Sequence, residues 1–398
     1  MITEVKEMKR IEVADALRGF SLFGIFIANL LIFQFGLTGQ TFIEFYHLNS
    51  VNQGVYDFIK TIFENSFMPI FAILFGFSLD KLYQSMKLKE LKRPRLKLFR
   101  RAIFLLIIGL VHSIYIWEGD ILFGYSLSML IIIPFISLGK RFFKWIAIIG
   151  LVLLFSMNVL GLLDDEEVNI SDKEKETYVE KVQHVFSNGT YPEIHNSDST
   201  IKDPSLVYMK DDLGDAVGLI FLFAFIMEAI FFVFGIYLSK AKWFEKDARL
   251  FWSSKLFIYL IPISILGKSS YLWIDNENIS ESLHGIFSMT LAFGMMCFFK
   301  YLYQKKSENI VLQGFKNLGK MSLTMYILQS VIGTLIFYSY GLGLFGKDIL
   351  IFTIIIFIIV YICQMLLATW YQKNLRYGPL EYILRMFTYF KFKVRAKG

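Results

Sequence analysis

The apolar residues of this chain lie in separate blocks of about 20, the length at which an α-helix crosses the hydrocarbon core of a bilayer. Inside a bilayer the backbone must satisfy its own hydrogen bonds, so only helices and closed barrels span it. Blocks of this length favour helices, because a barrel strand needs only about 10 residues. With 55% hydrophobic and 19% charged residues, the chain is also more apolar than a soluble domain. We therefore expect an all-α, polytopic membrane helical bundle.

About ten blocks are expected to form transmembrane helices of a single integral membrane domain that covers residues 1–398. Lys and Arg concentrate in alternate connections, and positive charge in short loops marks the cytoplasmic side. This distribution predicts that both termini are cytoplasmic, and it accounts for the net charge of +7 without a nucleic-acid partner. The expected spans are 14–36, 58–82, 101–117, 121–138, 143–163, 215–238, 251–270, 283–303, 321–341 and 348–369.

Two segments depart from the apolar pattern. Residues 164–213 are acidic, with a helical pattern in "DKEKETYVEKVQHVF", and we expect an extracytoplasmic loop. This loop either folds over the bundle or is a solvated linker. Residues 370–398 mix aromatic and basic side chains, which is typical of an amphipathic helix at the surface of an anionic bilayer.

The stretch "GLVHSIYIWEGDILFGYS", residues 109–126, places three ionisable side chains in apolar surroundings: His112, Glu118 and Asp120. Ionisable residues in a bilayer cost free energy, so they are candidates for function. A carboxylate that orients a histidine is the minimum for general base catalysis, and a proton relay would need the same groups. The alternative is a buried histidine beside two carboxylates that are wetted at the membrane surface.

The first span, "EVADALRGFSLFGIFIANLL", carries a possible ion pair. Asp15 and Arg18 are three residues apart, so they share a helix face and can pair. Arg18 would then hold a phosphate near the cytoplasmic boundary or, alternatively, serve only as a topology anchor. Asn29 lies about 16 Å deeper along the helix axis, where it could bind a ligand or bond to a neighbouring helix.

Other polar side chains inside the spans have no partner near them in sequence. Glu228 and His284 are isolated in apolar blocks. Ser322, Tyr326 and Gln329 follow at spacings of four and three, so they form a polar stripe on one helix face. In the second span, Pro69 is expected to kink the helix and Gly76 to allow close packing.

The sequence lacks the motifs of several common catalytic and binding sites. It contains no Walker A, G-x-G-x-x-G or G-x-S-x-G motif. Cys297 and Cys363 form no C-x-x-C pair, and no His/Cys cluster has the spacing of metal ligands. We expect no metal site and no covalently bound cofactor.

Five stretches together resemble a known family. "DALRGFSLFGIFIANL", "FAILFGFSLDK", "GLVHSIYIWEGDIL", "LGKMSLTMYILQSVIGTLIFYSYGLG" and "YGPLEYILRMFTY" are similar, in order and over nearly the whole chain, to the YeiB-like family. The C-terminal part of that family is catalogued as domain of unknown function 418. The resemblance implies a multi-pass protein of the bacterial plasma membrane, often labelled as putative transport.

A more distant similarity is to membrane-bound acyltransferases, including sugar O-acetyltransferases and the lysosomal heparan glucosaminide N-acetyltransferase. These enzymes have about ten or eleven spans. The O-acetyltransferases carry an Arg, ten residues and then a catalytic His in the first span, whereas here Arg18 is followed at that spacing by Asn29. The glucosaminide enzyme is similar in having Asn there and relies on another His. The resemblance therefore directs attention to His112 or His47.

This second resemblance implies an acyltransferase-like protein that moves an acyl group from cytoplasmic acetyl-CoA or acyl-CoA to a small-molecule, glycan or lipid acceptor. His112 would be the general base, oriented by Asp120 or Glu118, and Arg18, Asn29 and Gln329 would bind the donor. Lys and Arg in 81–101 would attract its phosphates.

Two other functions are also compatible with these residues. The first is a proton-coupled transporter of a small or lipid-like solute, with His112, Asp120 and Glu228 as the proton path. The second is a lipid-binding or regulatory membrane protein with neither activity. Whether the chain is an enzyme at all is therefore undecided, and so is whether it forms a homodimer in the bilayer.

Overall fold

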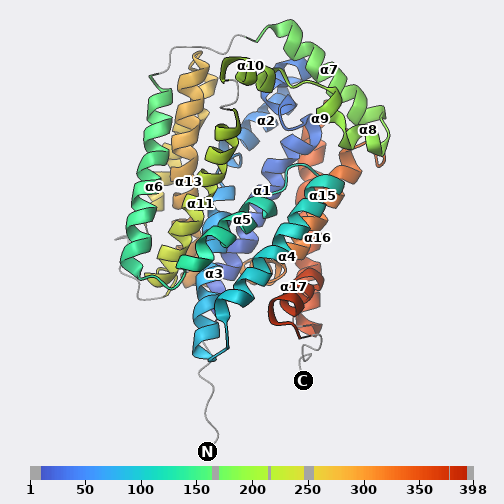
Figure 1. Cartoon of the computed structure of the whole chain (residues 1–398). Coiled ribbons are helices and arrows are strands. Elements are labelled where there is room, and N and C mark those ends of the chain that lie inside the picture. Colours follow the sequence, from blue (N-terminus) through green and yellow to red (C-terminus); the bar gives the residue numbers. More distant parts are fainter. Residues whose placement is uncertain (1–9, 164–169, 214–216, 246–254, 376, 392–398) are drawn as a thin grey trace, which may run out of the picture.

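The structure is a computed structural model that describes residues 10–163, 170–213, 217–245, 255–375 and 377–391, and these contain helices but no strand (Figure 1). The α-helices are α1 (Glu12–Phe35), α2 (Ser50–Ile62), α3 (Met68–Leu88), α4 (Pro94–Tyr115), α5 (Leu122–Ile132), α6 (Lys140–Gly161), α7 (Asp172–Asn188), α8 (Tyr191–His195), α9 (Ser197–Thr200), α10 (Pro204–Leu213), α11 (Val217–Lys240), α12 (Phe257–Lys268), α13 (Glu277–Lys306), α14 (Ile310–Gly319), α15 (Ser322–Phe337), α16 (Leu350–Asn374) and α17 (Pro379–Tyr389). Three short 3-10 helices join them: η1 (Gly39–Tyr46), η2 (Ile133–Phe135) and η4 (Ser269–Leu272).

Five helices in the described part of the chain are long and apolar enough to cross a membrane: α1, α4, α6, α13 and α16. The pair α14 and α15, which is bent by 90°, would make a sixth. The expectation of an all-α protein with helices that can span a membrane is therefore confirmed. Each of the ten expected spans overlaps a helix, but α5 and α12 are shorter than a full span. The number of crossings and the side of the termini stay predictions.

The expected second span, 58–82, is instead two helices. Helix α2 ends at Ile62 and α3 begins at Met68. Pro69 lies in the first turn of α3, where its missing N–H would have had no partner in any case. The expected kink at Pro69 was therefore wrong, because this proline begins a helix rather than interrupting one.

Glycines let pairs of helices touch at their backbones, as the expectation for Gly76 required. A Cβ built on Gly76 would lie 1.9 Å from the carbonyl oxygen of Phe232, and one on Gly235 would lie 1.9 Å from that of Ile73. Helices α3 and α11 are thus packed too closely for any side chain at either glycine. Small residues serve this purpose between membrane helices, where close contact replaces the hydrophobic effect.

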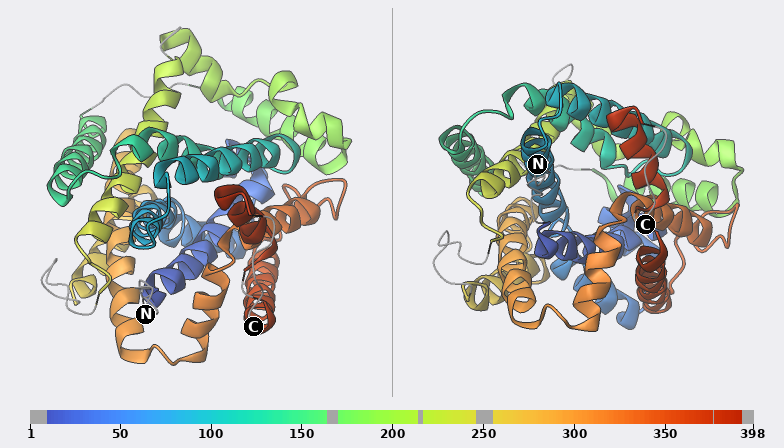
Figure 2. Two further views of the ribbon diagram at one scale, coloured as in Figure 1. Left: turned by 60° about the horizontal axis from the view of Figure 1, so that its bottom comes forward. Right: turned by 90° about the horizontal axis from the view of Figure 1, so that it is seen from below.

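Helix α1 runs through the middle of the bundle (Figure 2). It contacts α2, α3, α13, α14, α15 and α16, and two-thirds of its apolar stretch is buried. At its start, a Cβ on Gly319 would lie 1.9 Å from the carbonyl oxygen of Asp15, so the end of α14 packs directly on α1. This contact fixes the beginning of α1 against the bend between α14 and α15.

The acidic segment folds over one end of the bundle, opposite the end where α17 lies (Figure 1). Its expected helix is α7, which buries Val179, Val182 and Phe186. The Phe186 ring stacks on Phe345 at 4.8 Å between centroids, and its carbonyl oxygen accepts a 2.8 Å hydrogen bond from the Ser339 N–H. Residues 170–213 are therefore folded against the bundle, whereas residues 164–169 of the expected loop lie outside the described part and its extracytoplasmic side stays a prediction.

The C-terminal helix α17 is part of the bundle, and packs on α4 and α15. Its Glu381 accepts hydrogen bonds from the N–H groups of Leu323 (2.8 Å) and Thr324 (3.0 Å), and from the Thr324 hydroxyl (2.6 Å). These N–H groups begin α15 and have no partner within that helix. A side chain from α17 thus caps α15, a role that the expected surface helix over 370–398 did not include. Residues 376 and 392–398 of that segment lie outside the described part.

Candidate functional site

The hairpin between α4 and α5 brings His112 and Asp120 together. Nδ1 of His112 lies 2.9 Å from Oδ1 of Asp120, and each side chain is only 1% exposed. The other oxygen, Oδ2, accepts a 2.7 Å hydrogen bond from the Phe123 N–H at the start of α5. One carboxylate therefore both caps α5 and orients the imidazole.

The second ring nitrogen of His112 is left open. Because Nδ1 donates to a carboxylate, Nε2 of the neutral ring carries a lone pair. Nε2 is buried and has no hydrogen-bond partner among the residues that the structure describes. Buried polar atoms are nearly always paired in folded proteins, so Nε2 is the unsatisfied position of the dyad.

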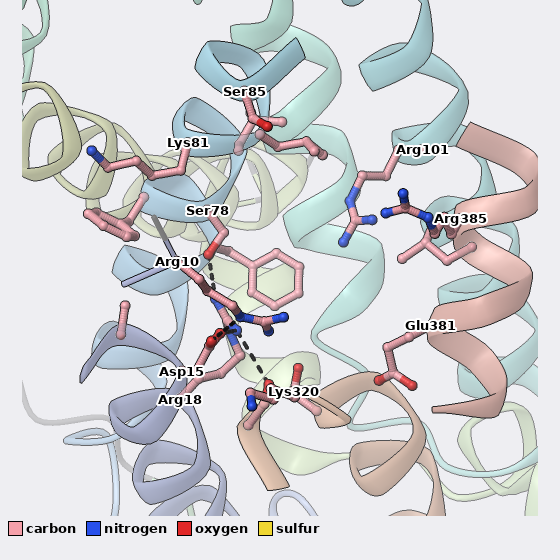
Figure 3. Close-up of a pocket in the computed structure, with 18 of the residues that line it drawn as sticks. Arg10, Asp15, Arg18, Ser78, Lys81, Ser85, Arg101, Lys320, Glu381 and Arg385 are labelled. Carbon is pink, nitrogen blue, oxygen red and sulfur yellow. Dashed lines mark hydrogen bonds and ion pairs between the residues drawn. The ribbon is translucent and has the colours of Figure 1, made fainter. Parts of the chain in front are cut away.

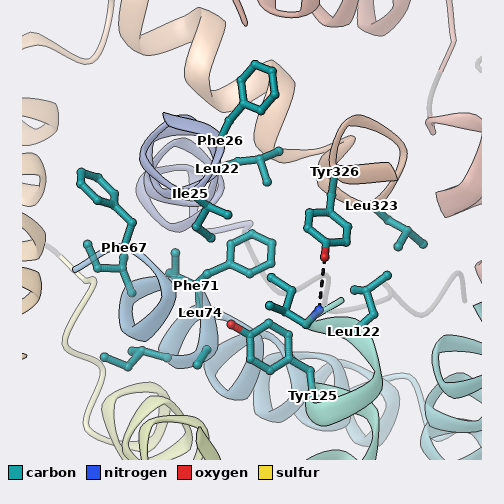
Figure 4. Packing of buried hydrophobic residues seen from close by; sticks show 14 of the residues in the cluster. Leu22, Ile25, Phe26, Phe67, Phe71, Leu74, Leu122, Tyr125, Leu323 and Tyr326 are labelled. Atoms are coloured by element: carbon teal, nitrogen blue, oxygen red, sulfur yellow. Dashed lines mark hydrogen bonds between the residues drawn. The ribbon is translucent and has the colours of Figure 1, made fainter. Parts of the chain in front are cut away.

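Tyr326 of α15 closes the dyad from the opposite side of the bundle. Its hydroxyl accepts a 3.2 Å hydrogen bond from the Ile121 N–H and lies 3.5 Å from Oδ1 of Asp120 (Figure 4). Its ring centroid is 5.3 Å from that of His112. Tyr326 thus ties the hairpin to a helix about 200 residues away in sequence.

The remaining candidates for general acid–base chemistry lie elsewhere. Glu118 is exposed, so the buried partner of His112 is Asp120. His47 is exposed at the end of η1. His284 belongs to another buried polar group, where its Nε2 lies 3.3 Å from the carbonyl oxygen of Lys60 and 3.7 Å from a Glu64 oxygen.

An apolar cavity of about 1150 Å³ extends from Asp120 between α3, α5, α6, α11 and α13. Its wall is mostly hydrocarbon, with a few polar side chains. Those polar lining residues are Asn65, Asp120, Tyr125, Asn158, Glu228 and Ser288. Of the two dyad residues only Asp120 lines this space, which we call the apolar cavity; its mostly hydrocarbon wall suits an oily ligand.

A second cavity, of about 430 Å³, lies where the start of α1, the second half of α3, α4, the bend between α14 and α15, and α17 meet (Figure 3). Six cationic side chains line it against two carboxylates, those of Asp15 and Glu381. The cationic residues are Arg10, Arg18, Lys81, Arg101, Lys320 and Arg385. We call it the basic pocket; its excess of positive charge favours an anion.

The arginines of the basic pocket differ in how they are held. Arg18 donates to Asp15 (3.1 Å), to the carbonyl oxygen of Gly319 (3.3 Å) and to the Ser78 hydroxyl, so the predicted Asp15–Arg18 pair is confirmed. Arg101, in contrast, has no carboxylate within 4 Å in the described ranges (Figure 3). Its guanidinium is therefore free to pair with a ligand anion.

Arg385 and Glu381 enter the basic pocket from α17. The guanidinium of Arg385 lies over the rings of Tyr377 (4.9 Å) and Tyr389 (5.0 Å), which hold it without neutralising it. Burial raises the pKa of the Glu381 carboxyl above its ordinary value, while hydrogen bonds from Thr324 oppose that shift. The pocket therefore becomes more positive when Glu381 is protonated.

The two cavities approach each other along α3, at the contact between Phe75 and Tyr125. Along α3, Met68 and Ala72 line the apolar cavity, whereas Phe75 and Ser78 line the basic pocket. The ring of Phe75 lies 5.0 Å from that of Tyr125, which lines the apolar cavity. The packing around this contact, drawn in Figure 4, includes Phe71, Leu74, Leu122 and Tyr326.

The expected donor-binding residues are only partly brought together. Arg18 lines the basic pocket. Asn29 is half-buried on α1 and lines neither cavity. Gln329 also lines neither, and its Nε2 donates to Gln364 at 3.0 Å, so it joins α15 to α16. The sequence did not single out Lys320 and Arg385, because only the folded chain brings these basic residues to Arg18.

In the part of the chain that the structure describes, no group of three His, Cys, Asp or Glu side chains could hold a metal ion. A buried cation that sequence reasoning missed is Lys268, whose Nζ donates to the carbonyl oxygen of Glu64 (2.5 Å) and the hydroxyl of Ser66 (2.8 Å). These bonds occupy the break between α2 and α3, so we assign Lys268 a structural role.

Comparison with known proteins places the chain among bacterial relatives. Residues 238–391 match a family described as "Protein of unknown function (DUF418)". The chain is 29% identical to the uncharacterized protein YxaH of Bacillus subtilis, over 98% of this chain and 96% of that protein. It is 23% identical to the uncharacterized protein YeiB of Escherichia coli, over 98% of each. No solved structure matches the chain significantly.

Proposed function

The chain belongs to the DUF418 family, and we propose that it is a membrane-bound acyltransferase that moves an acyl group from acetyl-CoA or acyl-CoA to an acceptor at or across the membrane. The observation that carries this proposal is the buried pair of His112 and Asp120, with Nε2 of the imidazole unpaired among the described residues. A fixed carboxylate and an open ring nitrogen are the parts of a general base.

The donor is assigned to the basic pocket. Coenzyme A carries several negatively charged phosphate oxygens, and guanidinium groups bind phosphate through paired hydrogen bonds. Arg101 and Arg385 have no carboxylate within 4 Å in the described ranges, and both point into the same 430 Å³ space as Arg18 (Figure 3). The supporting feature is thus a cluster of cations whose charge the protein only partly neutralises.

The proposed transfer step uses Nε2 of His112 as the general base. His112 takes the proton of an acceptor O–H or N–H group as the acceptor atom bonds to the acyl carbon. The carbon–sulfur bond of the thioester breaks, and the sulfur leaves as a thiolate that takes up the proton from the imidazolium. Asp120 stabilises the protonated ring meanwhile. His112 lines neither cavity, so the side chains around it must move before a donor in the basic pocket can reach Nε2.

We also propose a membrane topology and a cellular location for the chain. Ten crossings would leave both termini and the basic pocket on the cytoplasmic side, where acyl-CoA is made, and the segment 164–213 outside. The relatives are bacterial proteins, so the membrane would be the bacterial plasma membrane.

One observation favours a second candidate, a proton-coupled transporter of a small or lipid-like solute. The two cavities approach each other at the contact of Phe75 and Tyr125, an arrangement that is compatible with alternating access. Asp120 and Glu228 line the same cavity and could carry protons. This candidate predicts flux that follows a proton gradient and no acylated product.

The test is acyl-CoA binding and hydrolysis by the purified chain, with wild type beside His112→Ala. Saturable binding, with slow release of CoA that the variant loses, would support the acyltransferase. Absence of binding at millimolar acyl-CoA would remove it, and proton-driven flux in liposomes would then decide for the transporter.

A further inference from the structure

The two cavities have opposite electrostatic character. The basic pocket carries six cations, whereas the described lining of the apolar cavity includes Asp120 and Glu228 and neither Lys nor Arg. Hydrocarbon forms most of the remaining wall.

Two polar groups of this cavity lack a hydrogen-bond partner among the described residues, the Ser288 hydroxyl and the carboxylate of Glu228, and only the carboxylate can carry a charge. Oε1 of Glu228 is buried and has no hydrogen-bond partner among the described residues. Its Oε2 lies against α5, because a Cβ built on Gly124 would be only 2.4 Å away. Both oxygens of Asp120 are already used, by His112 and by the Phe123 N–H. A buried carboxylate without a partner is costly, so Glu228 is the position at which a ligand group would be stabilised.

We propose that the apolar cavity binds a single-chain amphiphile with a primary amine at its head, the ammonium group on Glu228 and the alkyl chain along the hydrocarbon wall. An ammonium donates three hydrogen bonds and complements the charge of Glu228. The cavity, about 1150 Å³, is somewhat larger than the ~300–1,000 Å³ of most ligand pockets, which suits a long chain.

If the proposed acyltransferase function holds, on which this step rests, the amphiphile is the acyl acceptor. The ammonium gives one proton to Glu228, and the amine nitrogen then attacks the thioester carbon. A second proton passes to Nε2 of His112 as the carbon–nitrogen bond forms. The carbon–sulfur bond breaks, and the thiolate is protonated by the imidazolium. The product is a neutral amide beside a protonated Glu228; once the amide leaves, Glu228 releases its proton to water and can bind the next ammonium.

The experiment measures binding of radiolabelled dodecylamine to the full chain in nanodiscs of zwitterionic lipid, with empty nanodiscs subtracted. Unlabelled dodecylamine, dodecanol and dodecanoate compete, so that chain length is constant and only the head changes. We expect dodecylamine to compete at least tenfold better than dodecanol, and dodecanoate to compete worst. Glu228→Gln should remove the preference for the amine and leave dodecanol binding unchanged. Glu176→Gln, an exposed carboxylate on α7, is the matched control.

Two results would overturn the proposal: equal competition by amine and alcohol in wild type, or a preference that survives Glu228→Gln. The comparison of amine with alcohol in the wild-type protein tests the proposal even if Glu228→Gln does not fold. Ser288→Leu, which fills the cavity, should weaken binding of all three amphiphiles. CoA release in the absence of amine is followed in the same samples, so loss of the amine site and loss of the acyltransferase are separate outcomes.

Discussion

Oδ1 of Asp120 lies 2.9 Å from Nδ1 of His112, and Oδ2 of the same carboxylate accepts the Phe123 N–H. A single side chain therefore fixes both the start of α5 and the orientation of the imidazole. Because the two side chains are almost fully buried, the ring has little freedom to choose another partner.

Asp120→Asn should lower CoA release from acyl-CoA by a factor of about 10² or more, the usual contribution of general base catalysis. The amide can donate to Nδ1, which would move the ring proton to Nε2 and remove the base, while its oxygen can still accept the Phe123 N–H. Thermal unfolding in detergent should change little. Glu118→Gln is the control, since Glu118 is exposed. An equal loss of activity in Glu118→Gln would contradict the assignment of Asp120.

Arg101→Gln should weaken binding of coenzyme A by about tenfold, the equivalent of ~1.4 kcal/mol. Arg101 lines the basic pocket without a carboxylate partner in the described ranges, so its charge is available to a phosphate. Isothermal titration of the purified chain gives the affinity. Arg100→Gln removes a neighbouring charge that does not line the pocket, because its guanidinium lies over the ring of Phe390. Similar losses in both variants would indicate general attraction rather than a site.

Binding of inorganic sulfate to the basic pocket should strengthen as the pH falls. Burial raises the pKa of Glu381, so this carboxyl is protonated at a higher pH than ordinary glutamate. Below the raised pKa the pocket has lost one negative charge, and above it the carboxylate repels the anion. The arginines stay charged throughout, and so does sulfate. A titration from neutral pH downwards measures the effect, and Glu381→Gln should flatten the profile. A profile that stays steep in Glu381→Gln would exclude this residue as its cause.

Local patterns in the sequence predicted the features that depend on neighbouring residues. Apolar blocks predicted the helices, because the length and composition of a single segment determine whether it can span a bilayer. Asp15 with Arg18, and His112 with Asp120, are close enough in sequence for the chain itself to bring them together. The helix α7 followed from its own periodicity.

Features that depend on distant segments could not be predicted in this way. Tyr326 meets Asp120 only because α15 packs across the hairpin, and Arg385 meets Arg18 only because α17 folds back on the bundle. Gln329 is a polar residue in an apolar helix. Its hydrogen-bond partner Gln364 is on α16, so the sequence alone could not predict that Gln329 joins two helices. The break before Met68 was missed although the sequence carries a signal for it: Glu64, Asn65 and Ser66 interrupt the apolar block there.

Gly76→Ala should lower the free energy of unfolding by about 1–3 kcal/mol, the usual cost of overpacking, or more if the helices must separate. The new Cβ would lie 1.9 Å from the backbone carbonyl oxygen of Phe232, which cannot turn away as a side chain can. Thermal unfolding of the purified chain in detergent measures the loss. Gly54→Ala is the matched control: nothing lies within 4 Å of its Cβ, and alanine favours a helix over glycine by ~1 kcal/mol. Gly54→Ala should therefore leave stability unchanged or raise it. If Gly76→Ala unfolded at the wild-type temperature, α3 and α11 would not be in backbone contact in the folded protein.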